Sequence, residues 1–263
     1  MNIKETQGLG RKEIFQLALK VRENGTLYDL NNKAQESNFC GSIDRFCWIA
    51  YEFKNQEKIL DVGPGPGLLS SLLYELGHKC FAIDIVDNRE VYPGIFLKKD
   101  IEFKQCNVEV DSIPYPNDYF DGVVCCQVLE HFSHSHLHAI KEMYRVLKPG
   151  GIIELDVPNV VSFRNRSRIL RGKNITYDYE THYLYSDPIS YKNQSFYPDR
   201  HNREFTIKEL KILLEAGNFK NINCTFLKSR RYRIGLSRIR SLGTMLKDMV
   251  PSLRKSLIGF AEK

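Results

Sequence analysis

Residues 58–70 read KILDVGPGPGLLS, a short apolar run that ends in Asp61 and leads into three glycines at alternate positions. Leucines then recur at helical spacing from Leu68 to Leu76. The pattern predicts a buried strand, a tight glycine turn and a helix, because glycine reaches backbone angles that other residues avoid. The start of such a helix offers free N–H groups to a ligand. From this stretch alone, an ordinary β–α turn without a ligand stays open.

Length and composition indicate one large globular chain. The 263 residues are 42% hydrophobic and 27% charged, which is ordinary for a folded domain. No run approaches the roughly 18 apolar residues of a membrane span, and residues 1–12 lack the apolar core of a signal peptide. We therefore expect a cytoplasmic protein. Its seven cysteines show no paired metal spacing and are expected to be reduced thiols.

The positive charge gathers near the C-terminus. Residues 228–263 hold ten Lys or Arg against two acids, a balance of +8, so the total of +6 leaves −2 for residues 1–227. An enzyme acting on nucleic acid needs basic residues around its site, so this distribution argues against such a substrate. Residues 229–252 alternate apolar and basic side chains at helical spacing. They predict an amphipathic insertion that either packs on the domain or makes peripheral contact with a membrane.

Strand and helix patterns continue on both sides of the glycine turn. Before it, two predicted amphipathic helices make residues 1–54 a segment that serves either as a lid or as packing. Further strands are expected at 79–85, 101–106, 120–126, 151–157, 221–227 and 257–261. Strands that alternate with helices predict an α/β fold with a doubly wound, mostly parallel sheet over residues 55–263.

Polar residues follow the ends of four predicted strands. They are the glycine turn, Asp84, Asn107 and Gln127. Ligands of such sheets bind at the carboxyl ends of the strands, so we expect these groups to share one rim. Asp84 follows the glycine turn at about 20 residues, the distance at which an acid binds ribose hydroxyls in dinucleotide folds. An acid that only caps a turn is the alternative.

The segment 158–204 differs from the rest of the chain. It is rich in Tyr, His, Asn and Arg and has no steady period. A structureless loop of this length is unusual in a compact domain and is often functional. We expect an irregular insertion on the acceptor side of the site, followed by a helix that starts with the capping box of Thr206 and Glu209.

These motifs together resemble the class I S-adenosylmethionine (SAM)-dependent methyltransferases. The matching stretches are residues 59–67, 82–85, 113–116 with 120–121, 128–131 and 145–151, while 257–263 is similar to the family's last strand. The resemblance implies a seven-stranded, Rossmann-like methyltransferase fold, here with N-terminal helices and an acceptor-side insertion.

The resemblance also implies a SAM site along the predicted rim. Asp61 and the glycine turn would lie against the methionine moiety and the ribose, and Asp84 would hold the ribose hydroxyls. The family usually carries an acid where this chain has Asn107, whose side-chain oxygen can accept from the adenine amino group. The implied cofactor-binding residues are Asp61, Gly63, Pro64, Gly65, Gly67, Asp84, Ile85, Asn107, Val108 and Gln127.

Methyl transfer from an activated cofactor mainly requires an acceptor held in line, with a base where a hydroxyl must lose its proton. The candidate catalytic residues are His131, His182 and His201, although a lone histidine is more often structural. Some relatives bind a metal through Glu-x-x-Glu-His. Here Gln127 replaces the first glutamate, so no metal is expected.

A narrower resemblance concerns the acceptor. Residues 157–160 and 201–206 look like methyltransferases associated with cell-surface polysaccharide or lipid-linked saccharide synthesis. This implies methylation of a hydroxyl on a saccharide or on a lipid-linked or other small molecule, with Arg164, Tyr183 and Arg203 as candidate acceptor residues. The alternatives are a methyltransferase acting on RNA or another small metabolite, and a non-catalytic SAM-binding partner protein.

Overall fold

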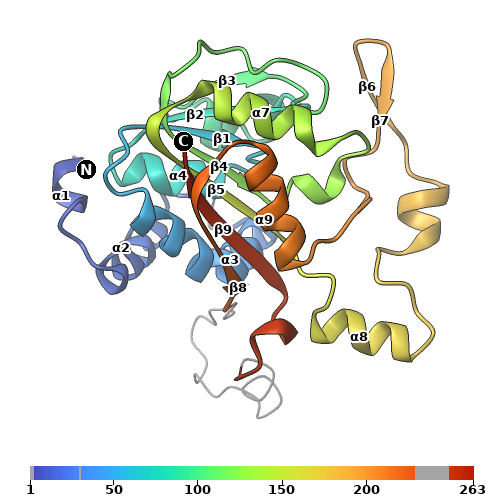
Figure 1. The fold of residues 1–263 in the computed structure, drawn as a ribbon. Coiled ribbons are helices and arrows are strands. Elements are labelled where there is room, and N and C mark those ends of the chain that lie inside the picture. The colour runs from blue at the N-terminus through green and yellow to red at the C-terminus, as the bar shows by residue number, and fades with distance from the viewer. Residues whose placement is uncertain (1–2, 30, 229–248) are drawn as a thin grey trace.

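The centre of the fold is a seven-stranded sheet. The structure, a computed structural model, describes residues 3–29, 31–228 and 249–263 (Figure 1). The strands are β1 Lys58–Val62, β2 Lys79–Asp84, β3 Glu102–Gln105, β4 Phe120–Cys126, β5 Leu147–Pro158, β8 Lys220–Leu227 and β9 Ser256–Glu262. They lie in the order β3-β2-β1-β4-β5-β9-β8. The first five run parallel, and β9 pairs antiparallel with both β5 and β8, which confirms the predicted fold class.

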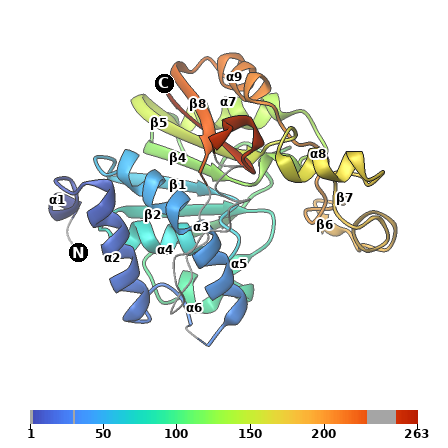
Figure 2. The ribbon, with the colours of Figure 1, turned by 90° about the horizontal axis from the view of Figure 1, so that it is seen from below.

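Helices cover both faces of this sheet (Figure 2). One face carries α2 Arg11–Glu23, α3 Lys33–Glu52 and α4 Leu68–Glu75, and the other carries α7 His136–Val146 and α9 Ile207–Ala216. Three short helices complete this part of the chain: α1 Ile3–Thr6, α5 Asn88–Val91 and α6 Pro93–Phe96. The sheet has one hydrophobic core on each face. Because α2 and α3 bury their apolar faces in the core that they share with α4, the N-terminal helices belong to the packing of the domain.

Alternation along the strands decides which side chains face each layer. In β1, Leu60 and Val62 join the core under α7, whereas Ile59 joins the core under α3 and α4. Asp61 therefore points toward α4. In β5, the same alternation places Leu155 under α7 and turns Asp156 toward α3. Acidic side chains thus enter the interior on the helical face that the N-terminal segment covers.

The segment 158–204 is more ordered than the sequence predicted. It contains α8 Phe163–Leu170, a π-helical turn η2 Glu180–Leu184 and a small hairpin. The hairpin strands are β6 Ile189–Tyr191 and β7 Gln194–Phe196. These elements are too short to leave a periodic sequence pattern, which is why the segment read as irregular. It stands out from the body of the molecule (Figure 2).

Two other expectations concern membranes and thiols. The predicted amphipathic insertion, 229–252, lies outside the described residues except for 249–252. Of these four residues, the last two form the start of the 3₁₀ turn η3 Pro251–Leu253. Among the helices of the described ranges, none has the length and apolar character needed to cross a bilayer. All seven cysteines are free thiols, as expected.

Gly122 of β4 gives a test of the packing between the N-terminal helices and the sheet. A Cβ there would lie 2.6 Å from the ring of Phe53, just after α3. Gly122→Ala is expected to lower the free energy of unfolding by about 1–3 kcal/mol through overpacking. Gly94→Ala, where a Cβ would meet nothing within 4 Å, is the control. Urea unfolding that finds the two variants equally stable would contradict this close packing.

Candidate active site

The glycines of the turn between β1 and α4 have two different roles, close internal packing and access of a ligand to the backbone. Gly63, Gly65 and Gly67 have φ of +69°, +51° and +73°. A Cβ on Gly63 would lie 2.4 Å from Val128 and one on Gly67 2.6 Å from Phe96, whereas one on Gly65 would meet nothing within 4 Å. Two of the three glycines are therefore required by internal packing. Gly65 alone faces open space into which a ligand can approach the backbone.

Asp61 and Asp84 end the neighbouring strands β1 and β2. Asp61 is buried, and its Oδ2 accepts a hydrogen bond from Ser70 Oγ at 2.6 Å. Burial raises the pKa of Asp61 to about 7, and the nearby charge of Asp84 adds to this. Asp84 is half-buried and accepts from the Val86 N–H at 3.2 Å and from Asn88 Nδ2 at 2.8 Å. The backbone N–H groups of Gly65 and Ile85 also hydrogen-bond to this carboxylate. Asp84 thus ties its own turn to the glycine turn, and a ligand would share its oxygens with these donors.

Asn107, just beyond β3, presents the opposite polarity from the one that the sequence suggested. Its Oδ1 accepts from the Glu109 N–H at 3.0 Å. Because a backbone N–H can only donate, this contact orients the amide. Asn107 Nδ2 is buried and has no hydrogen-bond partner in the described part of the chain. The group left for a ligand is therefore a donor, which suits an acceptor nitrogen of an adenine ring. An unsatisfied buried donor is costly, so a bound cofactor would stabilise this position.

Gln127, the first residue after β4, is held by a buried ion pair that sequence reasoning missed. Its backbone has φ of +55°. Gln127 Nε2 donates to Asp156 Oδ1 at 2.5 Å, and Arg45 Nη1 of α3 donates to the same oxygen at 3.0 Å. The side chain of Asp156 is fully buried and that of Arg45 is 15% exposed. Burial opposes the charge of Arg45, but the carboxylates, chiefly Asp156, raise its pKa.

A polar cavity adjoins Gln127 on the side of α3. Its volume is about 290 Å³, and it lies between α3 and the adjoining ends of β8 and β9. Its walls include Ser37, Asn38, Ser42, Arg45, Gln127 and Lys255. The sequence predicted an acceptor site in 158–204, whereas none of the described residues lining this cavity comes from that segment, and six of the ten belong to α3.

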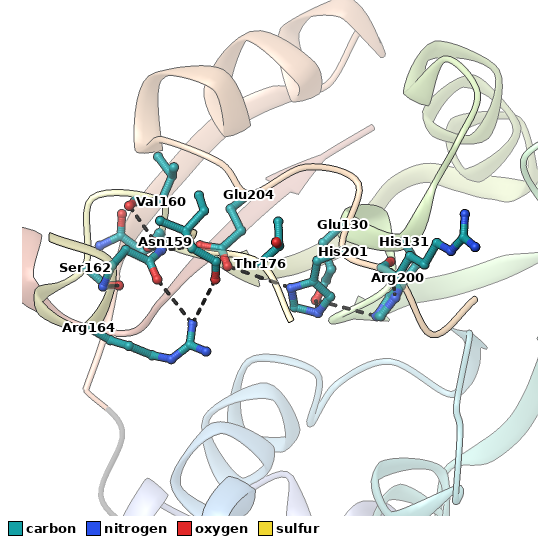
Figure 3. Close-up of polar contacts among 12 residues, drawn as sticks. Glu130, His131, Asn159, Val160, Ser162, Arg164, Thr176, Arg200, His201 and Glu204 are labelled. Atoms are coloured by element: carbon teal, nitrogen blue, oxygen red, sulfur yellow. Dashed lines mark hydrogen bonds and ion pairs between the residues drawn. The ribbon is translucent and has the colours of Figure 1, made fainter. Parts of the chain in front are cut away.

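A cluster of ionisable side chains lies just beyond β4 (Figure 3). Glu130 and His131 come from the turn η1 Leu129–His131, and His201 comes from the far end of the insertion. Glu130 Oε1 is 4.0 Å from Nε2 of each histidine. Glu130 is buried, and neither carboxylate oxygen has a hydrogen-bond partner among the described residues. Burial raises its pKa well above the usual range.

The two histidines of this cluster differ in their surroundings. His131 Nδ1 contacts the Arg200 carbonyl at 3.0 Å, and burial together with His201 lowers the pKa of His131 to about 4. His201 Nδ1 lies 3.8 Å from Glu204 Oε1, and its ring centre is 4.2 Å from that of Tyr177. Ligand atoms of Glu130, His131 and His201 all lie within 4.8 Å of one another, so these side chains could also hold a divalent ion.

The remaining candidate, His182, and three further histidines of the chain lie outside this cluster. His182 packs its ring against Tyr177, with ring centres 4.9 Å apart, and is not part of the cluster. His134 contacts a carboxylate, and His136 and His138 contact backbone carbonyls. His131 therefore pairs with a histidine distant in the sequence and not with its near neighbours.

The three predicted acceptor residues use their polar groups within the protein. Arg164 donates within α8 and to the backbone of the insertion (Figure 3). Tyr183 Oη donates to the His201 carbonyl at 2.6 Å, which positions the backbone of that histidine. The guanidinium of Arg203 pairs with Glu209 at the start of α9. Of the three, Tyr183 is tied most directly to the cluster.

Comparison with known proteins places these features in a family. A family model described as a methyltransferase domain matches residues 32–223. The ubiquinone biosynthesis O-methyltransferase of Mus musculus mitochondria is 37% identical over 109 residues, 39% of this chain and 29% of that protein. A ubiquinone/menaquinone biosynthesis C-methyltransferase of Coxiella burnetii is 28% identical over 150 residues, 52% of this chain and 58% of that protein. The chain thus spans only part of the length of these relatives.

Solved structures share the fold. A SAM-dependent methyltransferase from Archaeoglobus fulgidus matches with a TM-score of 0.57 at 18% identity, over 83% of this chain and 91% of that one. A Burkholderia thailandensis 1,6-didemethyltoxoflavin-N1-methyltransferase, solved with its acceptor and S-adenosylhomocysteine, matches with a TM-score of 0.54 at 17% identity, over 97% and 91% of the two chains.

The buried pair of Arg45 and Asp156 yields a stability test. Arg45→Met leaves Asp156 buried without its cation, so we expect a loss of about 3–5 kcal/mol in the free energy of unfolding. The loss should grow as pH rises, because an unpaired Asp156 is most stable in its protonated form.

The matched control for this test is Arg89→Met, which removes an ion pair to Asp87 with side chains 45% and 23% exposed. It should cost less than about 1 kcal/mol. Equal losses for the two variants in urea unfolding would rule out a special role for the buried pair.

Proposed function

The chain belongs to the methyltransferase domain family as a class I SAM-dependent methyltransferase, and on that premise we propose that it methylates a hydroxyl of a small polar acceptor. The observation that carries the proposal is the meeting of His201 and Glu130 beyond β4, next to the rim that would hold the cofactor. SAM supplies a methyl group already activated on a sulfonium, so the protein has to bind the acceptor, orient it and accept its proton.

The proposed cofactor site runs along the ends of β1 to β4. Gly65 offers open space at the backbone, Asp84 offers lone pairs to the ribose hydroxyls and Asn107 Nδ2 offers a donor to the adenine ring. Asp61 would lie near the cationic methionine end of SAM. The positive charge of SAM would favour the ionised form of the Asp61 carboxyl. Gln127 closes the site on the side of the acceptor cavity.

We propose His201 as the base that takes the proton of the acceptor hydroxyl. Its Nε2 faces Glu130, and its Nδ1 faces Glu204 at 3.8 Å. The proton taken from the acceptor would give His201 a positive charge, which the nearby carboxyl group of Glu204 would stabilise. His131 is the weaker base of the pair, because burial lowers its pKa to about 4. In this scheme His131 instead orients Glu130.

The polar cavity supports a hydroxyl-rich acceptor. Hydroxyl, amide and cationic groups line it, from Ser42, Asn38 and Lys255 among others, and these groups hydrogen-bond the hydroxyls of a saccharide or a similar molecule. The second candidate is a phenolic quinone precursor, which the names of the ubiquinone O-methyltransferase relatives favour. Those matches span 29%, 31% and 41% of the three relatives. Among the described residues, Leu227 is the single apolar side chain that lines the cavity, which offers little to a long apolar tail.

Calorimetric titration with SAM tests the cofactor site. Asp84→Asn is expected to weaken binding about tenfold to a hundredfold, since hydrogen bonds to a charged group contribute about 1.5–3 kcal/mol. Asp87→Asn, in the same loop but paired at the surface with Arg89, is the control and should bind SAM as the wild type does. Absence of SAM binding by the folded wild-type protein would refute the proposal as a whole.

Transfer of a labelled methyl group tests the base and the acceptor together. Cell extract is divided into glycan, quinone-lipid, RNA and small-molecule fractions, and the fraction that takes up label is kept as substrate. His201→Asn is expected to slow this transfer about a hundredfold to ten-thousandfold while SAM affinity stays unchanged.

His134→Asn, which alters an exposed histidine beside Glu109, is the control and should retain full activity. Full activity of His201→Asn would exclude it as the base. Label in the quinone-lipid fraction alone would favour the second candidate acceptor, and label in RNA alone would refute both.

A further inference from the structure

The helix α8 exposes an unusual amount of apolar surface. Phe163, Ile169 and Leu170 are 54%, 62% and 87% exposed. The helix contacts η3, and the two residues just before η3, Met249 and Val250, are 76% and 46% exposed. α8 stands at the edge of the molecule beside η3 (Figures 1 and 2). These five side chains, which we call the α8 surface, form an apolar edge away from both cores.

The sequence in and around α8 is rich in positively charged residues. Residues 161–175 contain five cations and no acid, which are Arg164, Arg166, Arg168, Arg171 and Lys173. In the described part of the chain, none of the five forms an ion pair with a carboxylate. Three of the arginines donate instead to backbone carbonyls nearby, at 2.6–2.9 Å, which holds their side chains close to the helix. Among the described residues, the positive charge of α8 is therefore not paired with a carboxylate.

We propose that the α8 surface docks on an anionic membrane. Exposed aliphatic and aromatic side chains enter the boundary between headgroups and acyl chains, while arginines beside them contact lipid phosphates. A nucleic acid would match the charge, but Phe163 is the one ring among the five side chains of the α8 surface, and the other four cannot stack on bases. Charge and apolar exposure together thus select a lipid surface.

The attachment of α8 connects this surface to the candidate active site. Asn165, the buried residue of the helix, donates to the Asn159 carbonyl and to the Glu204 carboxylate. Glu204 in turn faces His201 at 3.8 Å. Docking through α8 would therefore bring the insertion 158–204, and with it His201, close to the membrane surface. An acceptor carried by a lipid would be available there.

Vesicle co-sedimentation tests the docking without SAM or an acceptor, so its outcome does not depend on the proposed reaction. The wild-type protein is expected to bind vesicles of phosphatidylcholine with phosphatidylglycerol and to bind pure phosphatidylcholine weakly. Ile169→Ser with Leu170→Ser should lower the partition coefficient about tenfold or more, because each buried CH₂ contributes about 0.8 kcal/mol. Leu97→Ser, at a residue 65% exposed outside the α8 surface, is the apolar control.

A second pair of variants tests the charge. Arg166→Gln with Arg171→Gln should lower binding about thirtyfold, since each of the two cations near an anionic surface contributes about 1 kcal/mol. Lys12→Gln with Lys20→Gln on α2 is the matched control and should bind as the wild type does. Circular dichroism and SAM titration verify that all variants are folded.

Four results would overturn the proposal. They are absence of wild-type binding to phosphatidylglycerol vesicles, equal losses in the control variants, tight binding of the α8 surface to RNA that the same variants abolish, and a dimer in light scattering that Ile169→Ser with Leu170→Ser dissociates.

Discussion

The buried contact between Arg45 and Asp156 is the interaction on which the geometry of the site depends. It joins the N-terminal helical layer to β5, across 111 residues of sequence. Asp156 also holds Gln127 at the end of β4, so one carboxylate sets the position of two walls of the polar cavity. Glu154 and Glu130 lie buried nearby, and together with Asp156 they raise the pKa of Arg45, which keeps this cation charged in the interior. The helices before the glycine turn are therefore part of the site and not only a cover for the sheet.

The rim of the sheet follows from chain order. Parallel strands bring their carboxyl ends to one edge, so Asp61, Asp84 and Asn107 had to become neighbours once the strands were recognised. Their individual contacts did not follow. The sequence pattern predicted the same role for all three glycines. Gly63 and Gly67 are in fact required because Val128 and Phe96, side chains from other parts of the chain, leave no room for a Cβ. Likewise the sequence predicted that the side-chain oxygen of Asn107 would face the ligand. The Glu109 N–H donates to this oxygen instead, and Nδ2 is left without a partner among the described residues.

The insertion shows how a segment without a sequence period can still complete a site. The backbone N–H of Asn202 donates to the Glu130 carbonyl at 2.7 Å, and Tyr183 holds the His201 carbonyl. These contacts bring His201 to η1, so the cluster exists only because the insertion returns to the sheet. The same segment projects α8 outward, where its apolar and basic side chains remain exposed. One insertion thus serves the interior of the site and the outer surface.

The amino-acid sequence by itself determined the class of fold, the order of its strands along the chain and the rim on which the predicted cofactor residues lie, because these depend on local periodicity and on the direction of the chain. The pairing of His131 with His201, the role of Arg45 and the place of the polar cavity were decided only by the tertiary structure. The contacts involved join side chains that are 70 or more residues apart in the sequence. Examples are the contact of His131 with His201 and that of Arg45 with Asp156. No spacing rule encodes such contacts, since they arise from how whole layers pack against one another.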